Sequence, residues 1–137
     1  MYVIGSLQDV IDNNLNGCHD EIVLSSIAYQ TVSGLQYLHD RKSIHRDIKP
    51  SNVLISSNGR VKLADFGLVC TLDQDQSLAH SFVGSFSYMS PERLIGEPYS
   101  YSADIWGLGI TLYTLTLGHY PYINQESGKL PNIRYNI

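Results

Sequence analysis

The sequence predicts a mainly α-helical fold that contains one small β-hairpin and forms a single unit over residues 1–137. Two long segments, residues 20–40 and 102–117, repeat apolar side chains at the helical period. Between them, two short β-like runs flank the dipeptide Asn58-Gly59, which favours a tight hairpin turn. No internal repeat, low-complexity run or Pro/Gly-rich linker divides the chain, so we expect one domain or a part of one.

The N-terminal part is predicted to contain a short helix and a long one. Residues 6–13 favour a short helix, with Ser6 as its N-cap and one apolar face. That face consists of Leu7, Val10 and Ile11. The longer helix, residues 20–40, is expected to bury the positions that recur at the helical period, which are Ile22, Ile27, Ala28, Thr31, Val32, Leu35 and Leu38. Gly34 weakens helix formation by about 1 kcal/mol relative to alanine, so it indicates close packing.

The remaining elements are the hairpin, a long loop and a third helix. Residues 53–55 and 61–63 are the predicted strands. Residues 68–90 show no sustained periodicity, and such a long loop in a compact domain is usually functional. Residues 102–117 are apolar nearly all round, which predicts a buried helix with Trp106 in the core. Gly118 and then Pro121 indicate where this helix ends.

Composition and charge argue against several classes of function. The apolar fraction of 43% is ordinary for a globular protein, and a net charge of −4 offers no broad cationic field for nucleic acid or an anionic membrane. The longest apolar stretch, residues 105–117, is too short and too interrupted to span a bilayer, and the N-terminus lacks the basic region of a secretory signal. Cys18 and Cys70 fit neither a zinc motif nor a disulfide framework, so we expect free thiols in the cytoplasm.

Three short motifs follow one another along the chain. The segment HRDIKPSN (residues 45–52) precedes the predicted hairpin, DFG (residues 65–67) follows it, and SPE (residues 90–92) closes the polar loop. Together and in this order, they resemble the signature set of eukaryotic protein kinases. The resemblance implies the C-terminal lobe of the protein-kinase-like α+β fold, incomplete, running from the hinge to just after the buried helix.

The residue types suit phosphoryl transfer, which depends on positioning and charge neutralisation more than on covalent work by the protein. By the resemblance, Asp47 accepts the proton of the substrate hydroxyl and Lys49 neutralises the transferring phosphoryl group. Asn52 and Asp65 match the ligands of Mg²⁺, a cation that prefers oxygen donors. Because the hairpin folds back on itself, we expect these two side chains to approach one metal cluster. The implied cofactors are ATP and Mg²⁺.

The resemblance also places the nucleotide against the start of the chain. Met1, Tyr2 and Val3 match the hinge, whose backbone would contact the adenine, and Ser6 or Asp9 would face the ribose. The alternative for Ser6 is a plain helix entry. The other residues implied in binding the nucleotide and its metal ion are Lys49, Ser51, Asn52, Leu54 and Asp65, with Leu54 either under the adenine or simply packing.

Further residues of these motifs have implied supporting roles. His45 and Phe66 are expected to pack. Asp104 is expected to brace the loop that contains Asp47, since a buried lone aspartate is costly unless it is hydrogen-bonded. Arg46 either contacts a phosphorylated activation loop or forms an ordinary surface salt bridge.

Residues 77–94, with the sequence SLAHSFVGSFSYMSPERL, resemble the activation segment of the MAP kinase kinases. By this match Ser77 and Ser81 are candidate regulatory phosphosites, and the alternative is that they are ordinary loop serines. Each phosphate would add about −1.5 to −2 charges. Residues 118–122, GHYPY, also resemble that group, whereas Ser85 stands where the group usually has threonine.

Two classes of function therefore compete. The first is an ATP-dependent, dual-specificity protein kinase that acts on a MAP kinase and is activated by an upstream kinase. The second is a catalytically inactive kinase fragment that serves as a binding or decoy module. A kinase's Gly-rich loop, strand lysine, partner glutamate and last helices have no counterpart in these 137 residues. We therefore expect the chain alone to transfer no phosphate, and Glu92 to lack the arginine that pairs with it in kinases.

Overall fold

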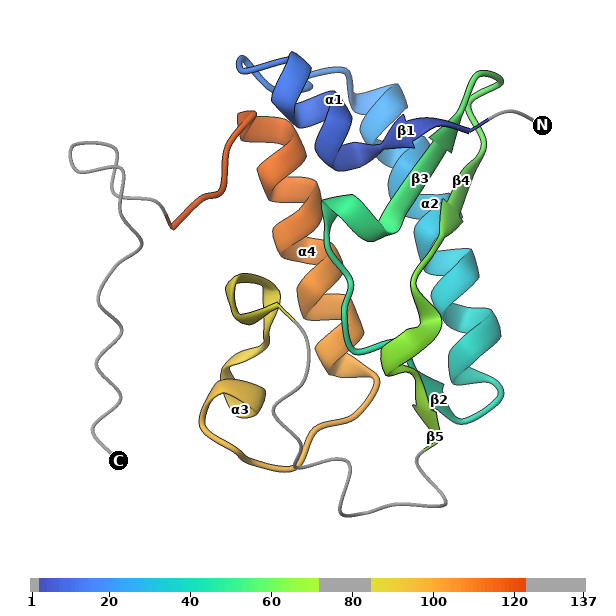
Figure 1. Ribbon diagram of the computed structural model, residues 1–137, viewed down its shortest axis with the longest axis vertical. Helices are drawn as coiled ribbons and strands as arrows, with labels where there is room; N and C mark the ends of the chain where they lie inside the picture. The colour runs from blue at the N-terminus through green and yellow to red at the C-terminus, as the bar shows by residue number, and fades with distance from the viewer. Residues whose placement is uncertain (1–2, 72–84, 123–137) are drawn as a thin grey trace.

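The computed structural model describes residues 3–71 and 85–122 (Figure 1). The described α-helices are α1 (Leu7–Asn13), α2 (Glu21–His39), α3 (Pro91–Leu94) and α4 (Ser102–Leu117). The strands are β1 (Val3–Ser6), β2 (Ser43–Ile44), β3 (Val53–Ser56), β4 (Val61–Leu63) and β5 (Cys70–Thr71), and the short 3₁₀ helices are η1 (Pro50–Asn52), η2 (Phe66–Leu68) and η4 (Phe86–Tyr88). Helix predominates, which confirms the predicted class. Over the described ranges, no helix is both long and apolar enough to cross a membrane.

Helix α1 begins with the predicted cap. The Ser6 hydroxyl accepts the Asp9 backbone N–H, and the Asp9 carboxylate accepts the Ser6 backbone N–H at 2.6 Å. Each side chain thus satisfies the backbone donor of the other, which is a capping box. Leu7 and Ile11 are buried as predicted, but Val10 is exposed, because the short helix buries only an i, i+4 stripe.

Helix α2 is one residue shorter at each end than predicted. Asp20 caps it by accepting the backbone N–H groups of the next turn. Its fully buried residues are Ile27, Thr31 and Leu35, four residues apart. The prediction was wrong for Ile22 and Val32, whose side chains are 81% and 44% exposed. At about 100° per residue, Ile22 lies opposite the buried stripe and Val32 a quarter-turn or more away from it.

The predicted hairpin is present as β3 and β4, paired antiparallel with Val53 opposite Leu63. Gly59 lies at the turn with φ +75°, a conformation that favours glycine. The prediction of a single hairpin was incomplete. Strand β1 adds to the other edge of β3, and β2 pairs with β5 in a separate two-stranded ladder. These additional strands pair across long stretches of sequence, where no local pattern signals them.

Helix α4 runs through the middle of the molecule, with α2 and the hairpin on one side and α3 on the other (Figure 1). It has the predicted bounds and ends at Gly118, whose φ is +76°. The placement of Trp106 in the core was wrong, since its side chain is 38% exposed. With Ile105 it lines an open apolar hollow on one face of the helix. The opposite face of α4 packs against α1, α2 and η4.

The apolar core is divided into clusters, each of which includes a residue of α4. One joins α1, α2 and β3 to the end of α4, and it contains Leu7, Ile11, Ile27, Val53 and Leu115. A second contains Leu35, Ile48 and Leu108, so it fixes the loop after β2 between α2 and α4. A third contains Ile44, Tyr99 and Ala103. The loop that carries the candidate catalytic residues is therefore anchored on both sides by buried side chains.

The loop between α1 and α2 meets the end of α4 through main-chain atoms. Cys18 donates its backbone N–H to Leu115 O at 2.9 Å. Gly17 has φ +74°, and a Cβ there would lie 1.9 Å from Thr116 O. A Cβ on Gly118 would lie 2.5 Å from Leu15 O. Only glycine fits at both positions, for reasons of conformation and of space.

Candidate active site

The backbone of the candidate catalytic loop is held by one buried carboxylate on α4. Asp104 Oδ2 accepts the backbone N–H of His45 at 2.9 Å, and Oδ1 accepts that of Arg46 at 2.8 Å. The His39 side chain, at the end of α2, pairs with Oδ2 at 2.9 Å and packs on the Tyr101 ring. Asp104 therefore has the bracing contacts expected of it, and a buried carboxylate with several donors is compensated for its lost hydration.

Strained backbone is concentrated in this region. Among the described non-glycine residues, positive φ angles occur at Lys42, Arg46 and Asp65. Arg46 has φ +70°, next to Asp47, and Asp65 has φ +59°. Such conformations persist only where surrounding contacts determine them, and they gather at functional sites. The Arg46 backbone is held on both sides, because its N–H donates to Asp104 and its carbonyl accepts from Arg93.

The buried Asp47 carboxylate accepts hydrogen bonds from its own loop and from Ser85, 38 residues away. Its Oδ2 accepts from Lys49 Nζ at 2.7 Å, and its Oδ1 accepts the backbone N–H of Ser85 at 2.9 Å. Lys49 Nζ also donates to Ser85 Oγ at 2.7 Å. Burial alone would raise the pKa of Asp47, but the hydrogen bonds from Lys49 and Ser85 outweigh it and lower that pKa below its ordinary value. The arrangement holds an ionised carboxylate beside a cation.

Asn52 shares the same carboxylate and closes the base of the hairpin. Its Nδ2 donates to Asp47 O at 2.8 Å and to Asp47 Oδ2 at 3.0 Å. Because both of these partners are acceptors, the amide nitrogen must face Asp47 and the amide oxygen must face away. The Asn52 backbone carbonyl accepts the N–H of Ala64 at 2.9 Å, which places Asp65 directly after this bond. The structure therefore brings Asn52 to Asp47 and sets Asp65 on the other side of the same hairpin base.

Asp65 is exposed and lightly engaged. Its Oδ1 accepts the backbone N–H of Gly67 at 3.4 Å, a long hydrogen bond. Within residues 3–71 and 85–122, no cluster of three or more His, Cys, Asp or Glu side chains forms a self-sufficient metal site. The Asn52 amide oxygen and the Asp65 carboxylate both lie at the hairpin's base. Two protein oxygens completed by other ligands suit Mg²⁺, which is usually bound through one or two carboxylates and substrate phosphates.

The residues predicted to face a nucleotide are only partly brought together. Ser6 lies opposite Leu54 in the β1–β3 register, so these two are neighbours across the sheet. Ser6 and Asp9 bind each other in the capping box, with their hydroxyl and carboxylate 2.7 Å apart. Ser51 is exposed in η1. Val3 is in β1, and Met1 and Tyr2 lie outside the described residues.

Arg46 is buried, so the alternative of a surface salt bridge is wrong. Its side chain donates to Leu68 O and lies 3.4 Å from the Tyr99 hydroxyl. Arg93, also buried, donates to Arg46 O at 2.7 Å and packs over the Tyr99 ring. The candidate phosphosites Ser77 and Ser81 lie outside the described residues, so the contact of Arg46 with a phosphorylated loop stays a prediction.

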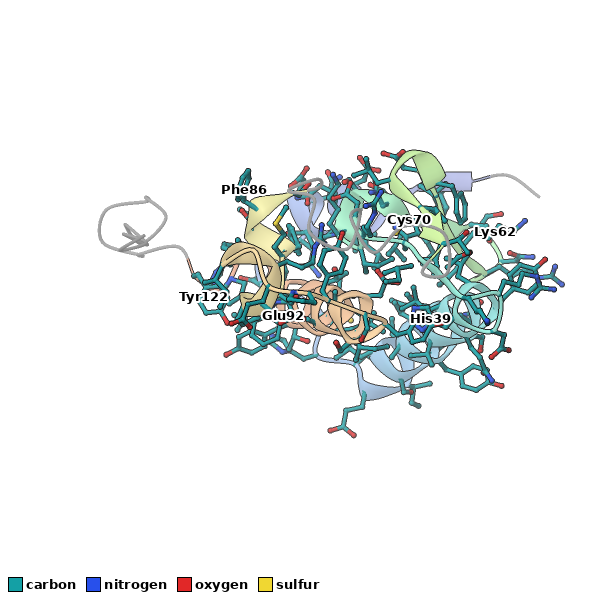
Figure 2. The ribbon with its side chains drawn as sticks, turned by 90° about the horizontal axis from the view of Figure 1, so that it is seen from below. His39, Lys62, Cys70, Phe86, Glu92 and Tyr122 are labelled. Atoms are coloured by element: carbon teal, nitrogen blue, oxygen red, sulfur yellow. The ribbon has the colours of Figure 1, made fainter. Side chains whose placement is uncertain are left out.

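Several contributors to the site were not singled out from the sequence. His39 contacts Asp104 across 65 residues, and Tyr99 and Arg93 contact Arg46 across 53 and 47 residues, so no local spacing reveals these contacts. Ser85 was visible only as a hydroxyl residue in the activation segment, and its contacts with Asp47 and Lys49 give it a place in the centre. Figure 2 shows that Phe86, which follows Ser85, lies on the side of Glu92 and Tyr122, opposite Lys62.

Comparison with known proteins agrees with this geometry. The family model of the protein kinase domain matches residues 1–136. The chain is 54% identical to the MAP kinase kinase skh1/pek1 of Schizosaccharomyces pombe over 104 residues, which are 76% of this chain and 28% of that protein. It is 46% identical to mitogen-activated protein kinase kinase 1 of Arabidopsis thaliana over 126 residues, which are 91% of this chain and 35% of that protein.

The same level of identity, 46%, relates the chain to the MAP kinase kinase MKK1/SSP32 of Saccharomyces cerevisiae over 128 residues, 91% of this chain and 25% of that protein. The chain thus spans about a third or less of the length of these curated relatives. The motif order, the buried loop around Asp47 and the match over nearly all residues agree with one another. The chain belongs to the protein kinase domain family, and its curated relatives in that family are MAP kinase kinases.

Proposed function

We propose that this chain forms part of the active centre of a protein kinase, which transfers the γ-phosphate of ATP to a serine, threonine or tyrosine hydroxyl of a protein. The observation that carries the proposal is the buried Asp47 carboxylate, held by Lys49, Asn52 and the Ser85 backbone. Such a group is ionised at neutral pH and lies next to a cation. Both properties suit phosphoryl transfer, which needs a proton acceptor and neutralised charge.

Asp47 would orient the acceptor hydroxyl and receive its proton. Its Oδ1 accepts one described hydrogen bond and its Oδ2 accepts two, so the carboxylate retains capacity for a further donor. Lys49 would hold the phosphoryl group beside this hydroxyl, because its ammonium carries three donors and the described contacts use two. Ser85 would keep these two side chains at a fixed separation.

The available oxygens fit the implied cofactors, ATP and Mg²⁺. Asn52 turns its amide oxygen away from Asp47, and the exposed Asp65 supplies a carboxylate at the same hairpin base. These would hold Mg²⁺, whose positive charge draws electron density from the phosphate oxygens. Leu54 and Ser6, neighbours across the sheet, would face the nucleotide together with Asp9, Ser51 and the hinge residues 1–3.

The relatives extend the proposal to a signalling cascade. All three are named as MAP kinase kinases, and a relative from Dictyostelium discoideum, 44% identical over 120 residues, is named as having dual specificity. We therefore propose a MAP kinase as the substrate and an upstream kinase as the activator, acting on Ser77 and Ser81. The two free cysteines agree with a reducing compartment, and we propose the cytoplasm.

A kinase assay tests the main proposal. Because the chain alone is expected to transfer no phosphate, a version extended upstream is incubated with ATP, Mg²⁺ and a MAP kinase whose own activity has been abolished, and phosphate transfer is measured. Asp47→Asn should lower the rate by about 100-fold or more, the usual contribution of a positioned base. Asp12→Asn is the matched control, because Asp12 is exposed on α1 and binds only Gln8 there. Equal rates in the two variants would refute the proposal.

The competing function is a binding module without activity. It is favoured by the apolar face of α4, where Ile105 and Trp106 line an open hollow and Tyr113 is exposed nearby. The 137-residue chain alone is expected to transfer no phosphate under either function, so the extended version distinguishes them. Binding to a MAP kinase without transfer, unaffected by Asp47→Asn, would favour it. Transfer that requires Asp47 would exclude it.

A further inference from the structure

Gln30 joins helix α2 to the hairpin through its side-chain amide. The amide oxygen accepts the backbone N–H of Val61 at 2.9 Å. The amide nitrogen donates to Gly59 O at 3.1 Å and to Ser26 Oγ at 3.2 Å. One planar group on α2 therefore makes two hydrogen bonds to backbone groups of the hairpin, two residues apart.

These two backbone groups lie on the open edge of the sheet. The strand order is β1-β3-β4, so among the described strands β4 has a neighbour on one side only. The carbonyl of residue 59 and the N–H of residue 61 are the pair that the N–H and C=O of one residue in an adjacent parallel strand would satisfy. The Gln30 amide offers one donor and one acceptor, so it replaces these two groups and fixes the position of the hairpin along α2.

A second contact follows one helical turn later. A Cβ on Gly34 would lie 3.2 Å from Leu63 Cδ1, so α2 and β4 approach closely here. Figure 1 shows β4 running beside α2. Gln30 and Gly34 are four residues apart and share a helix face. The hairpin is thus attached to α2 near its tip by hydrogen bonds and near its base by packing.

The base of the hairpin is where the candidate metal ligands lie. Asn52 immediately precedes β3, Asp65 follows β4 by one residue, and the Ala64 N–H to Asn52 O bond joins the two sides. At about 3.3 Å per residue, residue 63 at the end of β4 lies about 7 Å along the strand from residue 61, and Asp65 follows two residues later. Asn52 is held separately by its hydrogen bonds to Asp47, so a tilt of β4 against α2 would move Asp65 relative to Asn52.

We propose that Gln30 is a positioning residue: its amide sets the angle of the hairpin and thereby the separation of Asn52 and Asp65. The expected effect on the affinity for a divalent cation with ATP rests on the proposed function. Its structural part, control of the hairpin base from α2, is independent of that function. Gln30 touches neither ligand and makes no contact with Asp47 among the described hydrogen bonds.

Gln30→Met tests the inference, because it keeps the length of the side chain and removes both the donor and the acceptor. Gln36→Met is the matched control, since it is the same substitution at an exposed position of the same helix. Two quantities are measured on the 137-residue chain. One is hydrogen exchange of the Ala64 amide relative to amides in the core of α4. The other is binding of Mn²⁺ in the presence of ATP, followed by electron paramagnetic resonance.

We expect Gln30→Met to speed exchange at Ala64 while amides of α4 are unchanged, and to weaken Mn²⁺ binding by about tenfold, as for groups that orient metal ligands. Gln36→Met should change neither. If Gln30→Met does not fold, Gln30→Glu replaces it, since it keeps the acceptor for Val61 and loses the donor to Gly59.

The outcomes separate the two proposals. If Ala64 exchange in Gln30→Met equals that in Gln36→Met, the inference is overturned whatever the protein's activity. If Ala64 exchanges faster but Mn²⁺ affinity is unchanged, Gln30 is only structural and the inference is again overturned. If the wild-type chain does not bind Mn²⁺ with ATP, the proposed function fails for this chain, while faster exchange at Ala64 still upholds the control of the hairpin base.

Discussion

Replacing Asp104 should destabilise the fold by more than any other single change to a polar side chain of the candidate site. In Asp104→Ala the backbone N–H groups of His45 and Arg46 lose their acceptor, and both residues are buried. An unsatisfied buried donor costs about 1–3 kcal/mol, so the two together cost about 2–6 kcal/mol. A domain of this size is stable by about 5–15 kcal/mol, so the loss is a large share.

Asp104→Asn provides a graded comparison. It retains one oxygen, which can accept either His45 N–H or Arg46 N–H but not both, and its amide nitrogen then faces the other donor. We expect about half the loss seen in Asp104→Ala. Asp12→Ala serves as the control, because Asp12 is exposed and its replacement should change stability by less than about 0.5 kcal/mol.

Urea unfolding followed by tryptophan fluorescence measures these differences. The chain has a single tryptophan, Trp106, two residues from Asp104 on the same helix, so the signal reports on α4. The slope with urea should be unchanged, and the midpoint should fall. A loss in Asp104→Ala below about 1 kcal/mol would refute the reasoning, since it would mean that the loop finds other acceptors at no cost.

Further expectations concern glycine, pH and a buried hydroxyl. Gly59→Ala should lower the free energy of unfolding by about 1 kcal/mol through backbone strain alone. Gly17→Ala has nearly the same φ but should lower it by several kcal/mol more, because its Cβ would meet a carbonyl of α4. Equal urea midpoints for the two variants would contradict this expectation. Folding lowers the pKa of Asp47, so the ionised carboxylate contributes fully to the free energy of unfolding above its unfolded pKa of about 3.9, and this contribution is lost as pH falls through the folded value. The stability difference between wild type and Asp47→Asn should therefore be constant above about pH 5 and shrink below about pH 4. A difference that grows in acid would refute this expectation. Thr111→Val should be neutral or stabilising by about 1 kcal/mol, since the Thr111 hydroxyl is buried without a hydrogen-bond partner among the described residues. Thr114→Val removes a hydrogen bond to the Ile110 carbonyl and should destabilise by about 1 kcal/mol. A calorimetric Tm that is lower for Thr111→Val than for Thr114→Val would contradict this expectation.

Sequence reasoning succeeded where the determining signal is local. The end of α4 follows from Gly118, the start of α1 from Ser6, and the hairpin from Asn58-Gly59. Each of these residues either adopts a special backbone conformation or accepts a backbone hydrogen bond within a few positions, so its effect can be predicted from the neighbouring sequence.

Prediction failed where burial depends on distant partners. Residues 102–117 are apolar nearly all round, and this pattern does not tell which face is covered; the structure covers the face opposite Ile105 and Trp106. Strands β2 and β5 are two residues each and acquire their pairing only from the tertiary fold.

In the candidate site, too, the local motifs could be predicted from the sequence and the long-range contacts could not. The motifs suggested that Asp47, Lys49, Asn52 and Asp65 act together, and the hairpin explained how Asn52 and Asp65 could share one end. The contacts of Ser85 with Asp47 join segments 38 residues apart, and those of Asp104 with His45 join segments 59 residues apart. No spacing rule reaches so far, because such contacts are selected by the packing of whole helices.

The main-chain contact between Gly17 and the end of α4 has a genetic consequence. A side-chain clash can be relieved by shrinking the neighbour, so a second mutation elsewhere often rescues the first. Here the neighbour is the carbonyl of Thr116, which every amino acid possesses. A selection for restored folding from Gly17→Ala should therefore recover glycine at position 17 itself, and substitutions at Thr116 should not appear among the suppressors.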